Sequence, residues 1–297
     1  MDIASGTIDS VADVIAALER EAYVTDAALG TAVFLTIKLG KPILVEGPAG
    51  VGKTEVAKAL ARVLGTELIR LQCYEGLDVT SAIYEWNYQK QLLAIKIQEG
   101  ANLSIEEKEE HIFGPAFLME RPLLRSILAK DRPPVLLVDE IDRADEAFEA
   151  FLLELLSDFQ ITIPEMGTVK AKHVPYVVLT SNRTRELGDA LKRRCLYHWI
   201  PYPTLEKELR IVRSRLPGIR DELARQIVGF VQRVREMDLA KPPGVVETLD
   251  LAEALMALGR DAVDPAATQA TLGCVVKSSE DLEKINAAGI EQILGTI

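Results

Sequence analysis

Residues 47–54 read Gly47-Pro48-Ala49-Gly50-Val51-Gly52-Lys53-Thr54, which matches the pattern G-x-x-x-x-G-K-[ST]. The apolar run Ile43-Leu44-Val45 precedes this stretch, and the helix-favouring segment 55–64 follows it. In such a strand–loop–helix unit the backbone N–H groups of the loop face an oligophosphate, and the helix N-terminus adds a favourable field. The stretch therefore predicts nucleotide binding in preference to a plain turn.

The residue types of this loop each suit a phosphate ligand. Glycine allows the backbone to curl, the Lys53 ammonium is expected to reach the β- and γ-phosphates, and the Thr54 hydroxyl is expected to ligate Mg²⁺. No Asn/Thr-Lys-x-Asp pattern that would read guanine occurs, so ATP is preferred over GTP. The predicted nucleotide-binding residues of the loop are Gly47, Pro48, Ala49, Gly50, Val51, Gly52, Lys53 and Thr54.

A second motif follows an apolar run. Residues 135–138 read as a buried strand after two prolines, and Asp139-Glu140 comes directly after them. In P-loop ATPases an acidic residue at this strand end holds Mg²⁺, so Asp139 is predicted to bind the metal and the nucleotide. Glu140 is placed to polarise the attacking water. Asp142 is expected to cap the next helix, over residues 143–159, rather than to act in catalysis.

Polar and basic residues accompany two further strand-like runs. Residues 176–180 lead to Asn182, which either contacts the attacking water and the γ-phosphate or forms a turn with its own backbone. Arg193 and Arg194 precede the run 196–200. They either reach a nucleotide held by a neighbouring subunit or stay solvated beside a strand. Local sequence alone leaves the two alternatives for Asn182 even, and it favours solvated side chains for the two arginines.

Composition narrows the function classes. The net charge of −11 argues against binding along a nucleic-acid backbone. Cys73, Cys195 and Cys274 lie far apart, which favours buried thiols over a zinc or redox site and suits a reducing cytoplasm. No apolar run is long enough to span a bilayer and no secretory signal is evident, so we expect a cytoplasmic protein without a transmembrane segment.

Together these residues resemble the AAA+ ATPases, and specifically the MoxR family. The markers are the stretches 46–54, 138–144 and 180–182. The chain is also similar to the CoxD-like branch, which is encoded beside aerobic carbon monoxide dehydrogenase. That similarity is carried by residues 71–79, 84–88, 146–154, 181–185 and 191–199. The resemblance extends from about residue 24 to residue 294.

The resemblance implies an α/β fold of the AAA+ P-loop NTPase type. A nucleotide-binding core over residues 1–203 would hold a five-stranded parallel sheet of order 5-1-4-3-2, and residues 204–297 would form a C-terminal helical lid. The expected strands are residues 42–46, 67–71, 135–138, 176–180 and 196–200. The core would also contain a helix-2 insert near 81–117 and a hairpin before sensor 1 near 159–171.

Aromatic residues alternate within the expected insert. Tyr84, Trp86 and Tyr88 predict a strand with one aromatic face. That face either packs into a core, which we prefer, or is exposed to a partner.

The resemblance also implies an activity and partners. Asn182 would be sensor 1, Arg193 the leading trans-acting finger and Arg194 the alternative, acting with Glu140 in a ring that is usually hexameric. The cofactors would be ATP and Mg²⁺. The implied function is chaperone-like remodelling of a protein, with a von Willebrand factor A-domain adaptor and a carbon monoxide dehydrogenase-type metalloenzyme as client. No nucleic-acid partner is expected.

The chain departs from the family pattern in its lid. Many AAA+ proteins present a sensor-2 arginine there, but the corresponding stretch 241–248 contains none. Lys241, or an arginine elsewhere in the lid, would have to substitute. Two rival functions stay open, a nucleic-acid-dependent motor and an assembly scaffold with little turnover. The net acidity counts against the motor, and Glu140 counts against the scaffold.

Overall fold

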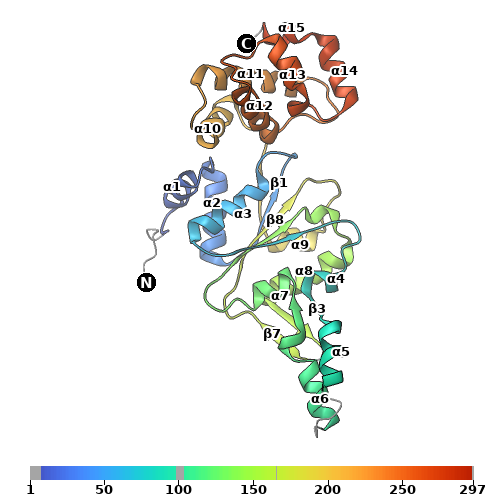
Figure 1. The fold of residues 1–297 in the computed structure, drawn as a ribbon. Helices are drawn as coiled ribbons and strands as arrows, with labels where there is room; N and C mark the ends of the chain where they lie inside the picture. The colour runs from blue at the N-terminus through green and yellow to red at the C-terminus, as the bar shows by residue number, and fades with distance from the viewer. Residues whose placement is uncertain (1–7, 98–103, 165, 296–297) are drawn as a thin grey trace. The chain divides into compact units, whose positions relative to one another are not determined.

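The computed structural model describes residues 8–97, 104–164 and 166–295 (Figure 1). The chain divides into two compact units. The first unit contains residues 31–45 and 60–198, and the second contains residues 8–30, 46–59 and 199–297. Each unit has its own hydrophobic core. The division into a core and a lid at residue 203 stays a prediction.

A five-stranded parallel sheet has the order β2-β5-β8-β1-β9. Its strands are β1 (Ile43–Glu46), β2 (Leu68–Gln72), β5 (Val135–Asp139), β8 (Tyr176–Ser181) and β9 (Leu196–Trp199). Every residue of β1 and β5 is buried, as expected for strands of a parallel sheet that is covered on both faces. Counted along the chain and read from the β9 edge, the order is 5-1-4-3-2, which confirms the predicted topology.

Helices of the first unit pack their apolar side chains against this sheet. Leu123, Leu124 and Ile127 of α7 are completely or almost completely buried, and α7 contacts β2 and β5. Phe148 and Leu152 of α8 join the same core. The short helices and helical turns of this unit are α4 (Val79–Ile83), η2 (Pro115–Phe117), α7 (Pro122–Ile127), η3 (Ile141–Arg143), α8 (Glu146–Asp158) and α9 (Asp189–Arg194).

The segment between α4 and α7 forms a separate projection of the first unit. Its strands β3 (Tyr84–Trp86) and β4 (Leu118–Glu120) pair antiparallel, and its helices are α5 (Tyr88–Ile97) and α6 (Ile105–Ile112). Trp86 is buried and Tyr84 is half-buried against the core. The prediction of a strand through Tyr88 is wrong, because Tyr88 begins α5 and is exposed. Residues 98–103 of the expected insert lie outside the described residues.

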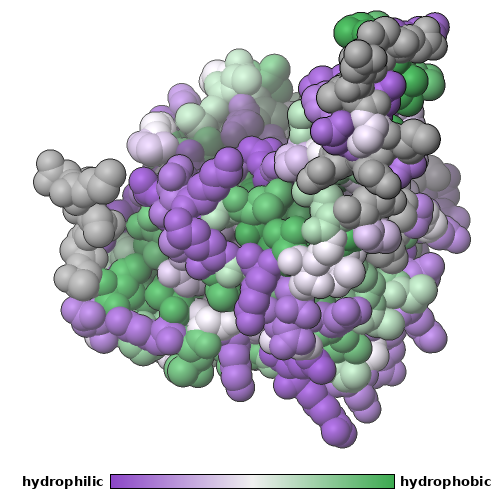
Figure 2. All heavy atoms as spheres, turned by 90° about the horizontal axis from the view of Figure 1, so that it is seen from below, coloured by the Kyte–Doolittle hydropathy of each residue, from purple (hydrophilic) through white to green (hydrophobic). Residues whose placement is uncertain are grey.

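Helix α5 exposes several large apolar side chains. Figure 2, which views the molecule from below, shows hydrophobic atoms beside the grey residues of this projection. The exposed apolar residues of α5 are Tyr88, Leu92, Leu93, Ile95 and Ile97.

Further along the chain, β6 (Gln160–Ile163) and β7 (Gly167–Lys170) form an antiparallel pair.

The second unit is helical. Its C-terminal part confirms the predicted helical segment and contains no strand between residues 204 and 295. Its helices are α1 (Val11–Arg20), α10 (Leu205–Arg215), α11 (Asp221–Glu236), α12 (Val245–Ala257), α13 (Pro265–Val275), α14 (Ser279–Ala288) and α15 (Ile290–Leu294). Helices α2 (Ala27–Leu39) and α3 (Lys53–Leu64) each have residues in both units. Among the described residues, no helix is both long and apolar enough to cross a membrane.

A buried ion pair joins three helices of the second unit. Glu208 of α10 and Arg235 of α11 form two hydrogen bonds of 2.9 Å, and their side chains are 0% and 7% exposed. Glu208 also accepts hydrogen bonds from Thr248 of α12 and from Gln232. The Arg235 guanidinium lies 4.8 Å from the ring centroid of Tyr202. Because a buried charge needs such partners, this network holds α10, α11 and α12 in one arrangement.

We predict that Arg235→Ala lowers the free energy of unfolding by about 3–5 kcal/mol, because Glu208 is then buried without its counter-charge. Arg225→Ala on the same helix is the control. Its ion pair with Asp221 is more than half exposed, so its loss should leave the free energy almost unchanged. Urea unfolding followed by circular dichroism measures both variants. Similar losses for the two would contradict the importance of the buried pair.

Candidate functional site

The glycine-rich loop between β1 and α3 has the backbone that a phosphate site needs. Gly50 and Gly52 adopt φ angles of +75° and +92°, which side chains other than glycine rarely tolerate. Lys53 is the first residue of α3, and its side chain is buried. The Lys53 ammonium donates hydrogen bonds to the carbonyl oxygens of Gly47 at 2.8 Å and Pro48 at 2.5 Å. Lys53 is thus held within the loop that it is predicted to serve.

The start of α12 packs directly on this loop. The N–H groups of Val245 and Val246 donate to the carbonyl oxygen of Gly50 at 2.9 and 3.3 Å. A Cβ atom built on Gly244 would lie 2.8 Å from both the Ala49 carbonyl oxygen and the Gly50 Cα. The two backbones therefore approach as closely as glycine permits.

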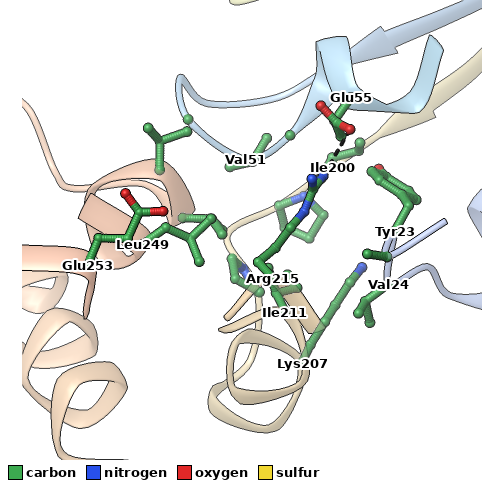
Figure 3. Close-up of a pocket in the computed structure, with 17 residues that line it drawn as sticks. Tyr23, Val24, Val51, Glu55, Ile200, Lys207, Ile211, Arg215, Leu249 and Glu253 are labelled. Atoms are coloured by element: carbon green, nitrogen blue, oxygen red, sulfur yellow. Dashed lines mark ion pairs between the residues drawn. The ribbon is translucent and has the colours of Figure 1, made fainter. Parts of the chain in front are cut away.

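A pocket of about 420 Å³ lies beside the loop, entirely within the second unit (Figure 3). Its walls come from the segment after α1, from the loop and α3, from α10 with the residues before it, and from α12. The labelled apolar residues among them are Val24, Val51, Ile200, Ile211 and Leu249. A mostly apolar pocket of this size with a few polar groups is typical of a small-molecule site.

The two basic side chains of the pocket form ion pairs. Arg215 of α10 points toward Glu55 of α3, and the two form an ion pair of 2.9 Å (Figure 3). Lys207 pairs with Asp26 at 2.8 Å. Burial raises the pKa of the Tyr23 hydroxyl, and the carboxylates of Asp26 and Glu55 add to that rise. Tyr23 therefore stays neutral at physiological pH.

In the first unit, the carboxylate of Asp139 lies at the end of β5 and is almost completely buried. Its Oδ1 accepts a hydrogen bond of 2.5 Å from the Thr180 hydroxyl of β8. Its Oδ2 accepts two hydrogen bonds from Arg70 of β2, at 3.0 Å from Nε and 2.6 Å from Nη2. Sequence reasoning placed Asp139 correctly at a strand end but missed both partners.

Glu140 has an unusual backbone and a shared side chain. Its φ and ψ angles of 55° and 50° are left-handed, a conformation that is uncommon outside glycine and often found at functional positions. Its N–H donates to the Thr180 hydroxyl at 3.0 Å. Its Oε1 accepts from the Asn182 amide at 3.3 Å, and its Oε2 accepts from Gln72 at 3.1 Å. Arg143 also pairs with Oε2 at 2.9 Å.

Asp142 connects the β5 end to the segment after β8. Its buried carboxylate accepts hydrogen bonds from the backbone N–H groups of Asn182 and Thr184. The prediction that Asp142 caps the next helix is wrong, because Asp145 is the N-cap of α8 and accepts from the Phe148 N–H. Asp145 stands immediately before the apolar periodicity of α8, which was the available signal.

The cluster around Asp139 holds one cysteine. Burial raises the pKa of the Cys73 thiol to about 12, and the carboxylates of Asp139, Asp142 and Glu140 contribute to that rise. Burial raises the pKa of Cys195 to about 12 as well. Both thiols are therefore protonated, and the three cysteines are free.

Arg193 and Arg194 end helix α9, and both are exposed. They differ in one contact, since Arg194 donates a hydrogen bond of 3.0 Å to the carbonyl oxygen of Leu153. The structure thus brings Asp139, Glu140 and Asn182 together, and it leaves the two arginines on the surface of the first unit.

A comparison with protein families matches residues 42–195 to the AAA domain of the dynein-related subfamily. The match covers more than half of the chain. The chain belongs to this AAA family. Membership supports ATPase activity, nucleotide binding with a divalent metal, and the P-loop assignment. The narrower MoxR and CoxD-like identity stays a prediction.

This AAA protein is similar to curated bacterial proteins that are described as uncharacterized. Proteins of Staphylococcus aureus strains bovine RF122 / ET3-1 and USA300 are 28% identical over 207 residues, which is 67% of this chain and 70% of theirs. Among solved structures, the Thermotoga maritima RuvB Holliday junction branch migration motor is 18% identical, with a TM-score of 0.46 over 89% of this chain and 71% of that one. A mutant of the same RuvB is also 18% identical, with a TM-score of 0.49 over 89% of this chain and 72% of that one.

The second unit of this AAA protein uses its arginines differently from the expected pattern. Arg235, the nearest arginine before the stretch 241–248, is buried in the ion pair with Glu208. Lys241 is exposed. Arg215 of α10 lines the pocket beside the glycine-rich loop, so this arginine of the second unit faces the candidate nucleotide site. Sequence spacing alone did not identify it.

We predict that Gly244→Ala lowers the free energy of unfolding by about 1–3 kcal/mol, because the added methyl group forces two backbone segments apart. Gly273→Ala in α13 is the matched control. A Cβ atom there meets nothing within 4 Å, and alanine should stabilise the helix by about 0.5–1 kcal/mol. Urea unfolding measures the two changes. A stabilising Gly244→Ala would contradict the close contact.

Proposed function

We propose that this AAA protein hydrolyses ATP with Mg²⁺ as cofactor. The observation that carries the proposal is the position of the Glu140 side chain. Its Oε1 accepts a hydrogen bond from the Asn182 amide, beside the buried Asp139 carboxylate. A carboxylate fixed next to a metal-binding carboxylate suits a base that orients or deprotonates the attacking water. Asn182 would contact the water and the γ-phosphate.

The residues present fit the nucleotide's phosphates and the metal. The positive φ angles of Gly50 and Gly52 suit a loop whose N–H groups would surround the phosphates, and the buried Lys53 would supply the positive charge. We propose that Thr54 and Asp139 hold Mg²⁺. When bound, the ion would neutralise charge on the β- and γ-phosphate oxygens. Oxygen ligands of this kind suit Mg²⁺.

The pocket in the second unit supports adenosine as the nucleoside. Its apolar walls include Val24, Ile200 and Ile211, and an adenine ring presents two apolar faces. Arg215 and Lys207 are cationic side chains of α10 at this pocket, each held by a carboxylate that a phosphate could replace as partner. We propose that Arg215 takes over the contact between lid and nucleotide that a sensor-2 arginine makes in other AAA+ proteins.

The proposed task of ATP hydrolysis is remodelling of a protein client. The MoxR and CoxD-like resemblance supports a chaperone role in maturation of a carbon monoxide dehydrogenase-type metalloenzyme, with a von Willebrand factor A-domain adaptor. The exposed apolar side chains of α5 support a protein as the partner, because such patches mark interaction sites. The net charge of −11 counts against a nucleic-acid motor.

A ring, with a hexamer as the expected size, follows from the proposed trans-acting finger. We propose Arg193 for that role because its side chain is exposed at the end of α9, whereas Arg194 contacts Leu153 within its own subunit. An arginine supplied by a neighbour stabilises charge that develops on the γ-phosphate.

We predict that Glu140→Gln keeps ATP binding but lowers turnover by about 10²–10⁴-fold, since it removes the proposed base. Lys53→Ala should abolish tight ATP binding. Glu67→Gln removes a half-exposed carboxylate that pairs with Arg125, and as the control it should change neither property. A coupled ATPase assay and fluorescent-nucleotide titration provide the readouts. Unchanged turnover in Glu140→Gln would contradict the mechanism, and negligible turnover of the wild type would favour a scaffold.

We predict that Arg193→Ala lowers turnover on the order of 10³-fold, and that Arg194→Ala lowers it less. Mixing Arg193→Ala with Lys53→Ala subunits should restore part of the activity, because the second supplies the finger that the first lacks. The assay is ATP turnover of the mixture against each variant alone. No recovery in mixed assemblies that are verified by mass would contradict a finger acting in trans.

A further inference from the structure

The carboxylate proposed to hold Mg²⁺ already has a cationic partner. Arg70 Nε and Nη2 both donate to Asp139 Oδ2, at 3.0 and 2.6 Å. A carboxylate oxygen has two lone-pair positions, so these two hydrogen bonds fill the acceptor capacity of Oδ2. The Asp139 side chain is 3% exposed, whereas that of Arg70 is 49% exposed. The arginine can therefore leave toward solvent while the aspartate cannot.

Arg70 is placed by the strand order rather than by neighbours in sequence. It lies on β2, which pairs with β5 in the register Gln72↔Asp139 and Arg70↔Leu137. Residues 70 and 72 project from the exposed side of β2, so both side chains meet the carboxylates at the β5 end. Arg70 lies two residues before the register partner of Asp139, and its side chain is long enough to reach the Asp139 carboxylate.

The contact also reaches the candidate catalytic base. Arg70 Nη2 hydrogen-bonds Gln72 Oε1, and Gln72 Nε2 donates to Glu140 Oε2 at 3.1 Å. A movement of Arg70 therefore removes the donor to Gln72 Oε1, on the side chain whose Nε2 holds Glu140. Glu140 itself has a cationic partner in Arg143, whose Nε pairs with Oε2 at 2.9 Å.

We propose that Arg70 is a counter-ion of Asp139, and that it competes with Mg²⁺ for Asp139 Oδ2, so that it must leave this oxygen when Mg²⁺ and nucleotide bind productively. The proposal rests on the proposed function, in which Asp139 is a metal-binding residue. Arg70 is a positioning residue in this scheme. It keeps the buried carboxylate neutralised, competes with the metal for one oxygen, and transmits its departure through Gln72 to Glu140.

The test compares Arg70→Gln with wild type in the full chain. The readout is the Mg²⁺ concentration that half-saturates binding of a fluorescent, non-hydrolysable ATP analogue. We expect this concentration to fall about tenfold in Arg70→Gln, because a charge-assisted hydrogen bond no longer has to be broken. Binding of the analogue in EDTA should change less than about twofold, since the loop and the pocket are intact.

Arg143→Gln is the matched control. It also removes one positive charge beside the carboxylate cluster, but the ion pair that is lost belongs to Glu140. If only the loss of one nearby positive charge mattered, the two variants would shift the half-saturating Mg²⁺ concentration (the Mg²⁺ midpoint) equally. A larger fall in Arg70→Gln than in Arg143→Gln supports direct competition at Asp139 Oδ2.

Thermal melting separates competition from a purely structural role. In EDTA the Arg70→Gln protein should melt below wild type, because Asp139 loses its counter-ion. With saturating Mg²⁺ and analogue the difference should shrink. A deficit that is equal in both conditions, or a Mg²⁺ midpoint that stays or rises, overturns the proposal. If wild type binds no nucleotide under any condition, the proposed function fails and the Arg70 proposal fails with it.

Discussion

The buried carboxylate of Asp139 determines which side chains must lie beside the end of β5 in the first unit. A charge in a protein interior is costly unless it is paired and hydrogen-bonded, so the end of β5 requires donors from both sides. Thr180 supplies one from β8, and Arg70 supplies the others from β2. These are the two strands that flank β5 in the sheet. The order β2-β5-β8 thus buries the apolar side chains of β5 and also brings the donors that stabilise the Asp139 carboxylate.

The same donors determine the geometry of the neighbouring residues. Thr180 donates to Asp139 and accepts from the Glu140 N–H, which anchors the left-handed backbone of Glu140. Asp142 then holds the backbone of Asn182, whose amide reaches Glu140. Asp139, Glu140 and Asn182 are therefore each held by a hydrogen bond to a residue on or just after a neighbouring strand. Such preorganisation is what electrostatic catalysis requires.

Local sequence patterns predicted the glycine-rich loop, the strand runs and the acidic strand end, because these features depend on neighbouring residues. The roles of Arg70, Gln72 and Thr180 were missed, because they depend on which strands lie side by side. The spacing of Tyr84, Trp86 and Tyr88 suggested a longer strand, yet Tyr88 is the first residue of a helix. A period of two over three residues is too short to separate the two structures.

The stretch 241–248 has no sensor-2 arginine, but backbone hydrogen bonds connect the glycine-rich loop to α12 in the second unit. Arg235 cannot serve, because Glu208 would remain buried and unpaired if it moved. The glycine-rich loop and α12 are joined through backbone, where the Gly50 carbonyl oxygen accepts hydrogen bonds from the first N–H groups of α12. Any rearrangement of the loop around a phosphate must alter these hydrogen bonds. Since Thr248 ties α12 to Glu208 of α10, and Arg235 ties α11 to the same carboxylate, that change would reach three helices of the second unit.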